Sequence, residues 1–141
     1  MKATDYFDSG FNCAQSVLLA LRESTGNTCS CIPAIAEGFG SGIKTGSVCG
    51  AVTGAVMGIG LEYGRKTPKD ISSKTHVEPL VKEFLRKFTE EHGTILCCEL
   101  LGVDVTTEQG VQHYKEKNMH EKCESFITTA TQIAQTLLSP E

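Results

Sequence analysis

Apolar side chains recur at intervals of three and four residues along three segments, the spacing of one helix face. The first stripe, in residues 11–23, consists of Ala14, Val17, Leu18 and Leu21. The second consists of Val77, Leu80, Val81, Phe84, Leu85 and Phe88. The third consists of Met119, Cys123, Phe126, Ile127, Ala130, Ile133, Ala134 and Leu137. No segment shows the sustained alternation of a strand, so the pattern predicts an all-α fold.

Residues near these stripes predict where the helices begin and end. Ser9, Gly10 and Asn12 precede the first stripe, and Gly93 follows the second as a stop signal. Pro79 fits only near a helix start, and Thr75 with Glu78 has the spacing of a capping box. We therefore expect the second helix to begin within residues 75–78, after a polar connecting loop over residues 65–75.

The middle of the chain is uncharged over residues 45–61, where every fourth residue is a glycine: Gly46, Gly50, Gly54 and Gly58. We expect a buried central helix with one glycine-lined face, because glycines in register permit close packing against another backbone or a cofactor. The same face suggests a homodimer contact. A membrane span is disfavoured, since the run sits at the short limit and contains few large apolar side chains.

The length of 141 residues suits one domain. We expect residues 1–141 to form a compact single-domain helical bundle with the glycine-rich helix at its centre. The net charge of −4 provides no positive field to gather phosphates, which argues against nucleic-acid binding.

The chain contains 7 Cys. Residues 1–11 carry charges and no apolar run, so we expect no secretory signal, a cytoplasmic location and reduced thiols. In that compartment a set of cysteines is more often metal-binding or catalytic than a disulfide framework, and the odd count argues against complete pairing.

Three cysteines follow residues able to cap a helix: Cys13 after Asn12, Cys49 after Ser47, and Cys97 after Thr94. We expect them at the first, second and third helical positions, where the helix dipole favours thiolate. Cys123 lies on the apolar stripe of the last helix and points inward. We call Cys13, Cys49, Cys97 and Cys123 the cysteine quartet; packed Cys side chains are the alternative interpretation.

Local spacing provides no ready-made site. The chain has no C-x-x-C and no H-x-x-x-H, so any metal site must be assembled by tertiary packing, and covalent haem attachment and thioredoxin chemistry are excluded. Cys29 and Cys31 form either a metal or redox pair or two ordinary loop thiols. Cys98 points about 100° away from Cys97 around a helix. His120 shares a face with Cys123, which suggests either a mixed site or a solvated histidine.

Glycines at alternate positions, Gly38, Gly40 and Gly42, follow no predicted strand, so a phosphate-binding loop is not expected.

Five stretches together resemble the C-GCAxxG-C-C family of redox-active proteins: residues 11–15 (FNCAQ), 39–43 (FGSGI), 49–54 (CGAVTG), 96–102 (LCCELLG) and Cys123. Carried over position by position, the family's characteristic cysteines fall on the quartet, and Cys29, Cys31 and Cys98 are additional. The family is similar to part of split-Soret cytochrome c, in which haem and an iron–sulfur site occur, but the haem motif is missing here. Selenocysteine in some relatives implies redox chemistry.

Three hypotheses follow. The first is an iron–sulfur cluster or other thiophilic metal on the quartet, serving electron transfer or redox sensing with an unidentified redox partner, with Gly50 and Gly54 letting backbone approach the cofactor. The second is a metal-free thiol–disulfide oxidoreductase in which Cys49 attacks and another quartet member, such as Cys13, resolves. The third is a structural zinc, or a purely packed cysteine core, supporting a dimeric interaction module.

Overall fold

The computed structural model describes residues 1–139, in which the regular secondary structure is helical apart from one isolated antiparallel bridge between Val48 and Leu96. The α-helices are α1 (Ala3–Asp8), α2 (Cys13–Thr25), α3 (Gly50–Tyr63), α4 (Glu78–His92), α5 (Cys97–Leu101), α6 (Glu108–Glu116) and α7 (His120–Leu138). Short helical turns are η1 (Ala34–Phe39), η2 (Gly42–Gly46) and η3 (Ser73–Val77). The all-α prediction is confirmed.

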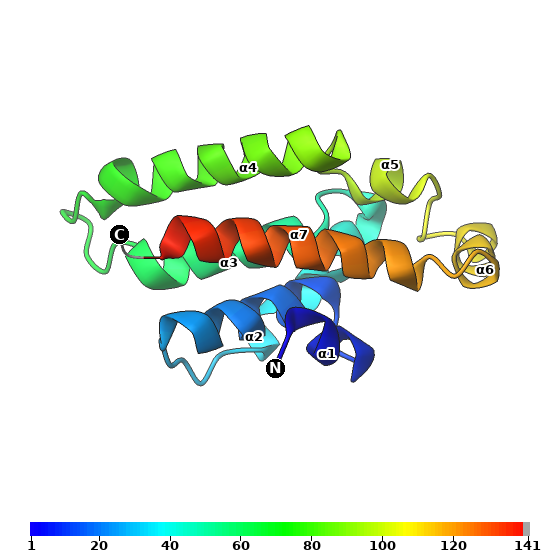
Figure 1. Cartoon of the computed structure of the whole chain (residues 1–141), viewed down its shortest axis with the longest axis horizontal. Coiled ribbons are helices and arrows are strands. Elements are labelled where there is room, and N and C mark those ends of the chain that lie inside the picture. Colours follow the sequence, from blue (N-terminus) through cyan, green and yellow to red (C-terminus); the bar gives the residue numbers. More distant parts are fainter. Residues whose placement is uncertain (140–141) are drawn as a thin grey trace.

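Four long helices form the body of the molecule. In Figure 1, α7 runs along the middle, with α4 above it, α2 below it and α3 behind it. Helix α7 contacts each of the other three, and α2 packs most extensively on α3. The predicted apolar stripes meet in this interior, whose largest fully buried side chains include Phe84, Phe88, Leu18, Leu21, Ile59 and Ile127.

Two helix starts agree with the sequence and one capping prediction is wrong. Helix α2 begins at Cys13, after Asn12, whose side chain accepts a hydrogen bond from the Gln15 amide at 2.9 Å. Helix α4 begins at Glu78, within the predicted range. Thr75 does not form a capping box with Glu78, because the chain is already helical in η3 and the Thr75 hydroxyl bonds to the Ile71 carbonyl.

The glycine face of α3 is covered by α2 of the same chain. A Cβ added at Gly50 would lie 3.0 Å from the Cys13 Cβ, and one at Gly54 would lie 2.6 Å from the Ala14 carbonyl oxygen. Gly46 does not belong to this face, since it ends η2 with a φ of +73°. The glycines therefore permit a close helix–helix contact within one chain, and a homodimer stays a prediction.

In residues 1–139, none of the helices combines the length and the apolar character that crossing a membrane requires.

We predict that Gly54→Ala lowers the free energy of unfolding by roughly 1–3 kcal/mol, because its new Cβ meets the α2 backbone rather than a movable side chain. Gly60→Ala is the matched control on the same helix. Among residues 1–139, no atom outside its own stretch of helix lies within 4 Å of its added Cβ. Higher helix propensity should then leave stability unchanged or raise it by up to about 1 kcal/mol. Urea unfolding followed by circular dichroism measures both; equal effects would contradict the close contact.

Candidate functional site

Helices α2, α3, α5 and α7 begin at the same end of the bundle, on the right in Figure 1, where α6 also lies. Cys13 and Cys97 are the first residues of α2 and α5, and Cys49 is the residue immediately before α3. Cys123 lies in the first turn of α7. Helix N-termini carry partial positive charge, so this end of the molecule favours negatively charged ligands or thiolates.

The quartet surrounds one cavity of about 340 Å³. Its other lining residues come from α1, the α1–α2 connection, the start of η2, α3, α5, the α5–α6 connection, α6 and α7: Phe7, Asn12, Ser41, Gly42, Gly50, Leu100, Leu101, Val105, Val111, Tyr114, Lys115 and Phe126. We call this space the quartet cavity. Cys13 and Cys123, which are 110 residues apart in the sequence, therefore line the same cavity, together with mostly apolar side chains.

Two backbone hydrogen bonds fix the connection before α3 beside the connection before α5. The Cys49 amide donates to the Ile95 carbonyl at 2.7 Å, and the Cys97 amide donates to the Ser47 carbonyl at 2.6 Å. These bonds flank the Val48–Leu96 bridge. They hold the main chain at Cys49 and Cys97 in a fixed relation without a sheet, which explains why no strand pattern predicted the contact.

Cys123 is the thiol best prepared to ionise. Its pKa is lowered from 9.0 to about 7, first because the Cys13 thiol donates a hydrogen bond to it. The Tyr114 hydroxyl also donates to the Cys123 Sγ, at 3.4 Å, and nearby His120 acts in the same direction. The pKa of Cys13 is raised well above 9.0, because a thiol that donates to Cys123 must keep its proton.

The other two quartet thiols are held neutral. Burial raises the pKa of Cys49 to about 11, although the amides of Ala51 and Val52 at the start of α3 pull it in the opposite direction. Burial also raises the pKa of Cys97 to about 12. Where an attacking thiolate is needed, these shifts favour Cys123 over Cys49.

The quartet sulfurs lie around the cavity rather than at one point. Within residues 1–139, the one group of three potential metal-ligand atoms lying within 4.8 Å of one another belongs to Asp8, His120 and Glu124. A tetrahedral zinc ion with Zn–S bonds of about 2.3 Å holds its sulfurs about 3.8 Å apart. The spread of the quartet is therefore wider than a single zinc ion needs.

Two predicted helix starts are wrong by two positions each. Cys49 is the capping residue of α3 instead of its second residue, and Ser47 lies in the connection that bonds to Cys97. Cys97 is the first residue of α5, not the third, and the Thr94 hydroxyl accepts from the Leu96 amide at 3.2 Å. Both starts are displaced because the paired main chain around the bridge fixes where helical geometry can begin.

Of four further residues that the sequence suggested for the site, one lines the cavity and three do not. Gly50 lines the cavity, whereas Gly54 packs on Ala14 and is not among the lining residues. Cys98 is a free, half-buried thiol outside the lining. His120 also lies outside it: its ring stacks on Phe7, and its Nε2 is 2.9 Å from Asp8 Oδ1.

Cys29 and Cys31 form a disulfide in the loop after α2, with Cα atoms 5.3 Å apart. The expectation that all thiols are reduced is therefore wrong for this pair. The physical reason is local: a tight turn places the two side chains within bonding distance. Neither residue lines the quartet cavity.

Sequence reasoning missed several cavity residues, notably Tyr114, Phe7 and Gly42. Tyr114 and Phe7 carry no motif, and only the tertiary structure brings them to Cys123. Gly42 belongs to the glycine series 38–42, which was a detectable signal. It has a φ of +62°, and a Cβ there would lie 2.8 Å from the Cys97 Cβ, so glycine keeps this wall close to the quartet.

We predict that one thiol of the reduced, metal-free protein, that of Cys123, titrates near pH 7, because hydrogen bonds to its sulfur stabilise the thiolate. The thiolate should predominate above this pH and the thiol below it. Tyr114→Phe removes one donor to the thiolate and should raise this pKa; Tyr63→Phe, on a ring stacked against His76 outside the cavity, should not. Ultraviolet thiolate absorbance measures the titration. The assignment fails if Cys123→Ser leaves the step near pH 7 in place.

Comparison with known proteins provides one match. No curated protein and no solved structure matches the chain. The family described as "Putative redox-active protein (C_GCAxxG_C_C)" matches residues 11–137, which cover the quartet and every element around the cavity from α2 to α7. The chain therefore belongs to the C_GCAxxG_C_C family.

Proposed function

We propose that the cysteine quartet is a thiolate site that holds an iron–sulfur cluster and serves electron transfer or redox sensing. The observation that carries this proposal is the position of four thiols from four separate helix starts around one cavity of about 340 Å³. Four cysteine thiolates are the usual ligands of iron–sulfur clusters, and soft sulfur donors select such clusters, zinc or Cu(I). A bound cluster would supply a reversible one-electron change.

The spread of the sulfurs supports a cluster over a single ion. Since no three quartet sulfurs lie within 4.8 Å of one another in the described chain, a lone zinc ion would require the cavity wall to contract. A cluster distributes its ligands over several metal atoms and suits a wider ring of donors. Zinc and an empty, packed site remain outcomes of the test below.

The protein groups around the sulfurs suit the tuning of such a site. The α3 amides of Ala51 and Val52 lower the pKa of Cys49, and Tyr114 donates to Cys123. Hydrogen bonds to ligand sulfur stabilise negative charge and raise a cluster's reduction potential. Gly50 keeps the start of α3 against Cys13. The apolar lining limits water near the sulfurs.

We predict that the protein takes up iron and sulfide under oxygen-free conditions and gains visible charge-transfer absorption. Cys49→Ser removes a proposed ligand and should weaken iron retention by more than the roughly 10- to 100-fold loss that follows removal of a ligand's hydrogen-bond partner. Cys98→Ser is the matched control, because Cys98 neighbours Cys97 but lies outside the cavity lining. Metal analysis and visible spectra measure both. A folded protein that retains no iron, or that binds zinc alone, would contradict the cluster.

The hydrogen bond between Cys13 and Cys123 favours a second candidate, a metal-free thiol–disulfide oxidoreductase. In this scheme the Cys123 thiolate attacks a substrate disulfide, forming a mixed disulfide and releasing one substrate thiol. Cys13 then loses its proton and attacks the Cys123 sulfur. A Cys13–Cys123 disulfide forms, and the second substrate sulfur leaves as a thiol. The substrate gains two electrons and two protons, and the protein loses them.

This candidate predicts a reversible disulfide between Cys13 and Cys123 after mild oxidation of metal-free protein, detected by peptide mass spectrometry. Cys13→Ser should abolish the intramolecular bond and leave Cys123 in mixed disulfides, whereas Cys98→Ser should leave the bond unchanged. Absence of the bond from oxidised wild type would remove this candidate. A cytoplasmic location stays a prediction of the sequence.

A further inference from the structure

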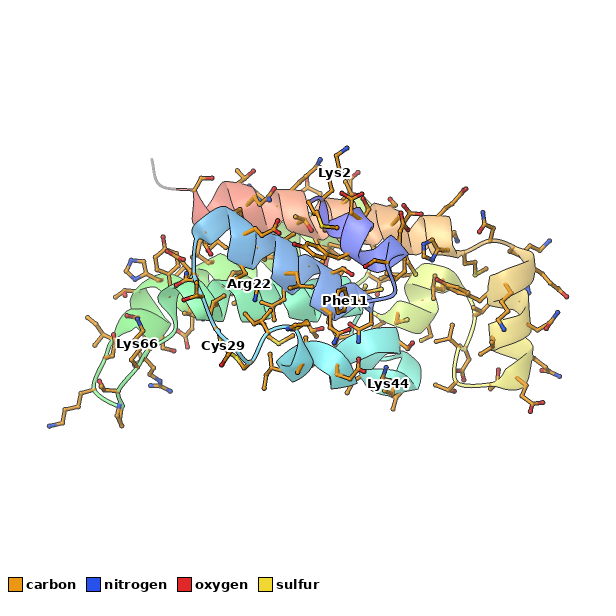
Figure 2. The ribbon with its side chains drawn as sticks, turned by 90° about the horizontal axis from the view of Figure 1, so that it is seen from below. Lys2, Phe11, Arg22, Cys29, Lys44 and Lys66 are labelled. Atoms are coloured by element: carbon orange, nitrogen blue, oxygen red, sulfur yellow. A yellow bond between two sulfur atoms is a disulfide. The ribbon has the colours of Figure 1, made fainter. Side chains whose placement is uncertain are left out.

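We propose that the Cys29–Cys31 disulfide is a second redox site, which exchanges two electrons with dithiols at the surface and is separate from the quartet cavity. The two cysteines enclose only Ser30. Neither lines the cavity, and Figure 2 shows Cys29 on the loop after α2, away from α5 and α6. The site does not rest on the proposed cluster.

The two cysteines differ in exposure. Cys31 is exposed, whereas Cys29 is half-buried and packs against the small apolar cluster formed by Ala14, Leu18, Leu19, Ile32 and Ala36. Attack by a thiolate needs an approach to one sulfur along the line of the S–S bond. Because Cys31 is the more exposed residue, its sulfur is the point of attack in this proposal, and the Cys29 sulfur is the leaving group.

The loop holds the pair together without help from the disulfide. The Ile32 amide donates to the Cys29 carbonyl at 3.2 Å, which closes a turn around Ser30, and the Ile35 amide donates to the Cys31 carbonyl at 2.8 Å. Ile32 is 6% exposed and anchors the turn in the apolar cluster.

The following residue, Pro33, is fixed to α2, because Gln15 Nε2 donates to its carbonyl at 3.3 Å. None of these contacts involves the S–S bond, so we expect them to remain when it breaks. They keep the Cα atoms near their 5.3 Å separation, within the range that a disulfide requires. The reduced pair is thus held ready to close again, which is the property a reversible exchange site needs.

The reaction balances with a dithiol as the reductant. One donor thiolate attacks the Cys31 sulfur, a mixed disulfide forms, the Cys29–Cys31 bond breaks, and the Cys29 sulfur takes a proton. The donor's second thiol loses its proton and attacks the donor sulfur of the mixed disulfide. Cys31 leaves as a thiolate and takes a proton. Two electrons and two protons pass to the protein, and the donor becomes a disulfide.

The test uses the full chain under native conditions with dithiothreitol as the probe. After timed exposure, free thiols are blocked with N-ethylmaleimide, and peptides bearing Cys29 and Cys31 are quantified by mass spectrometry. We expect both residues to become labelled at a rate proportional to dithiothreitol, while circular dichroism keeps its helical signal. Oxidised dithiothreitol should restore the bond. A pair that opens only when the helices unfold would overturn the proposal.

Single variants test which sulfur reacts. With Cys29→Ser, the remaining Cys31 should form a mixed disulfide with an aromatic disulfide reagent roughly tenfold faster than Cys29 does in Cys31→Ser, because access limits exchange. Peptide mapping separates these adducts from those of the quartet. Equal rates, or a faster Cys29, would overturn the assignment of Cys31. The wild-type measurement stands without either variant.

Discussion

The close contact between α2 and α3 is the constraint on which the rest of the structure depends. Three glycines of α3 face α2, so the backbones approach to a distance that any added side chain at Gly54 would prevent. The first of them, Gly50, meets Cys13 at the start of α2 and directly follows Cys49. The contact that packs the bundle therefore also sets the position of two quartet thiols.

Burial and helix ends act in opposite directions on these thiols. Removal from water favours the neutral thiol and dominates at Cys49 and Cys97, whose pKa values are raised to about 11 and 12. At Cys123 the hydrogen bonds from Cys13 and Tyr114 prevail over burial. A cationic metal group would reverse this balance, because ligand thiols lose their protons when metal binds. Cys49 and Cys97 are thus neutral thiols in the metal-free protein, and they would ionise only when a metal binds to their sulfurs.

The chain places its cysteines in two different environments. The quartet lies in an apolar interior assembled from helices that are distant in sequence. The Cys29–Cys31 pair lies in a surface turn, where access is high and two residues of separation suffice to bring the sulfurs together. An interior site restricts which molecules reach its sulfur, whereas a surface disulfide meets any dithiol large or small. The two environments therefore suit different redox partners.

By itself the sequence determined the helical class, the three apolar stripes and the start of α2 at Cys13, because helical periodicity and the Asn12 cap are local features. It also identified the quartet as a set, through helix-end positions and the family resemblance. The tertiary structure alone decided that the four thiols share one cavity, that Tyr114 reaches Cys123, and that Gly54 serves packing beside α2. The tertiary structure also decided at which residues α3 and α5 begin. Those features arise from hydrogen bonds and contacts between segments far apart in the chain, such as Cys97 with Ser47. The spacing of residues within one segment cannot predict them.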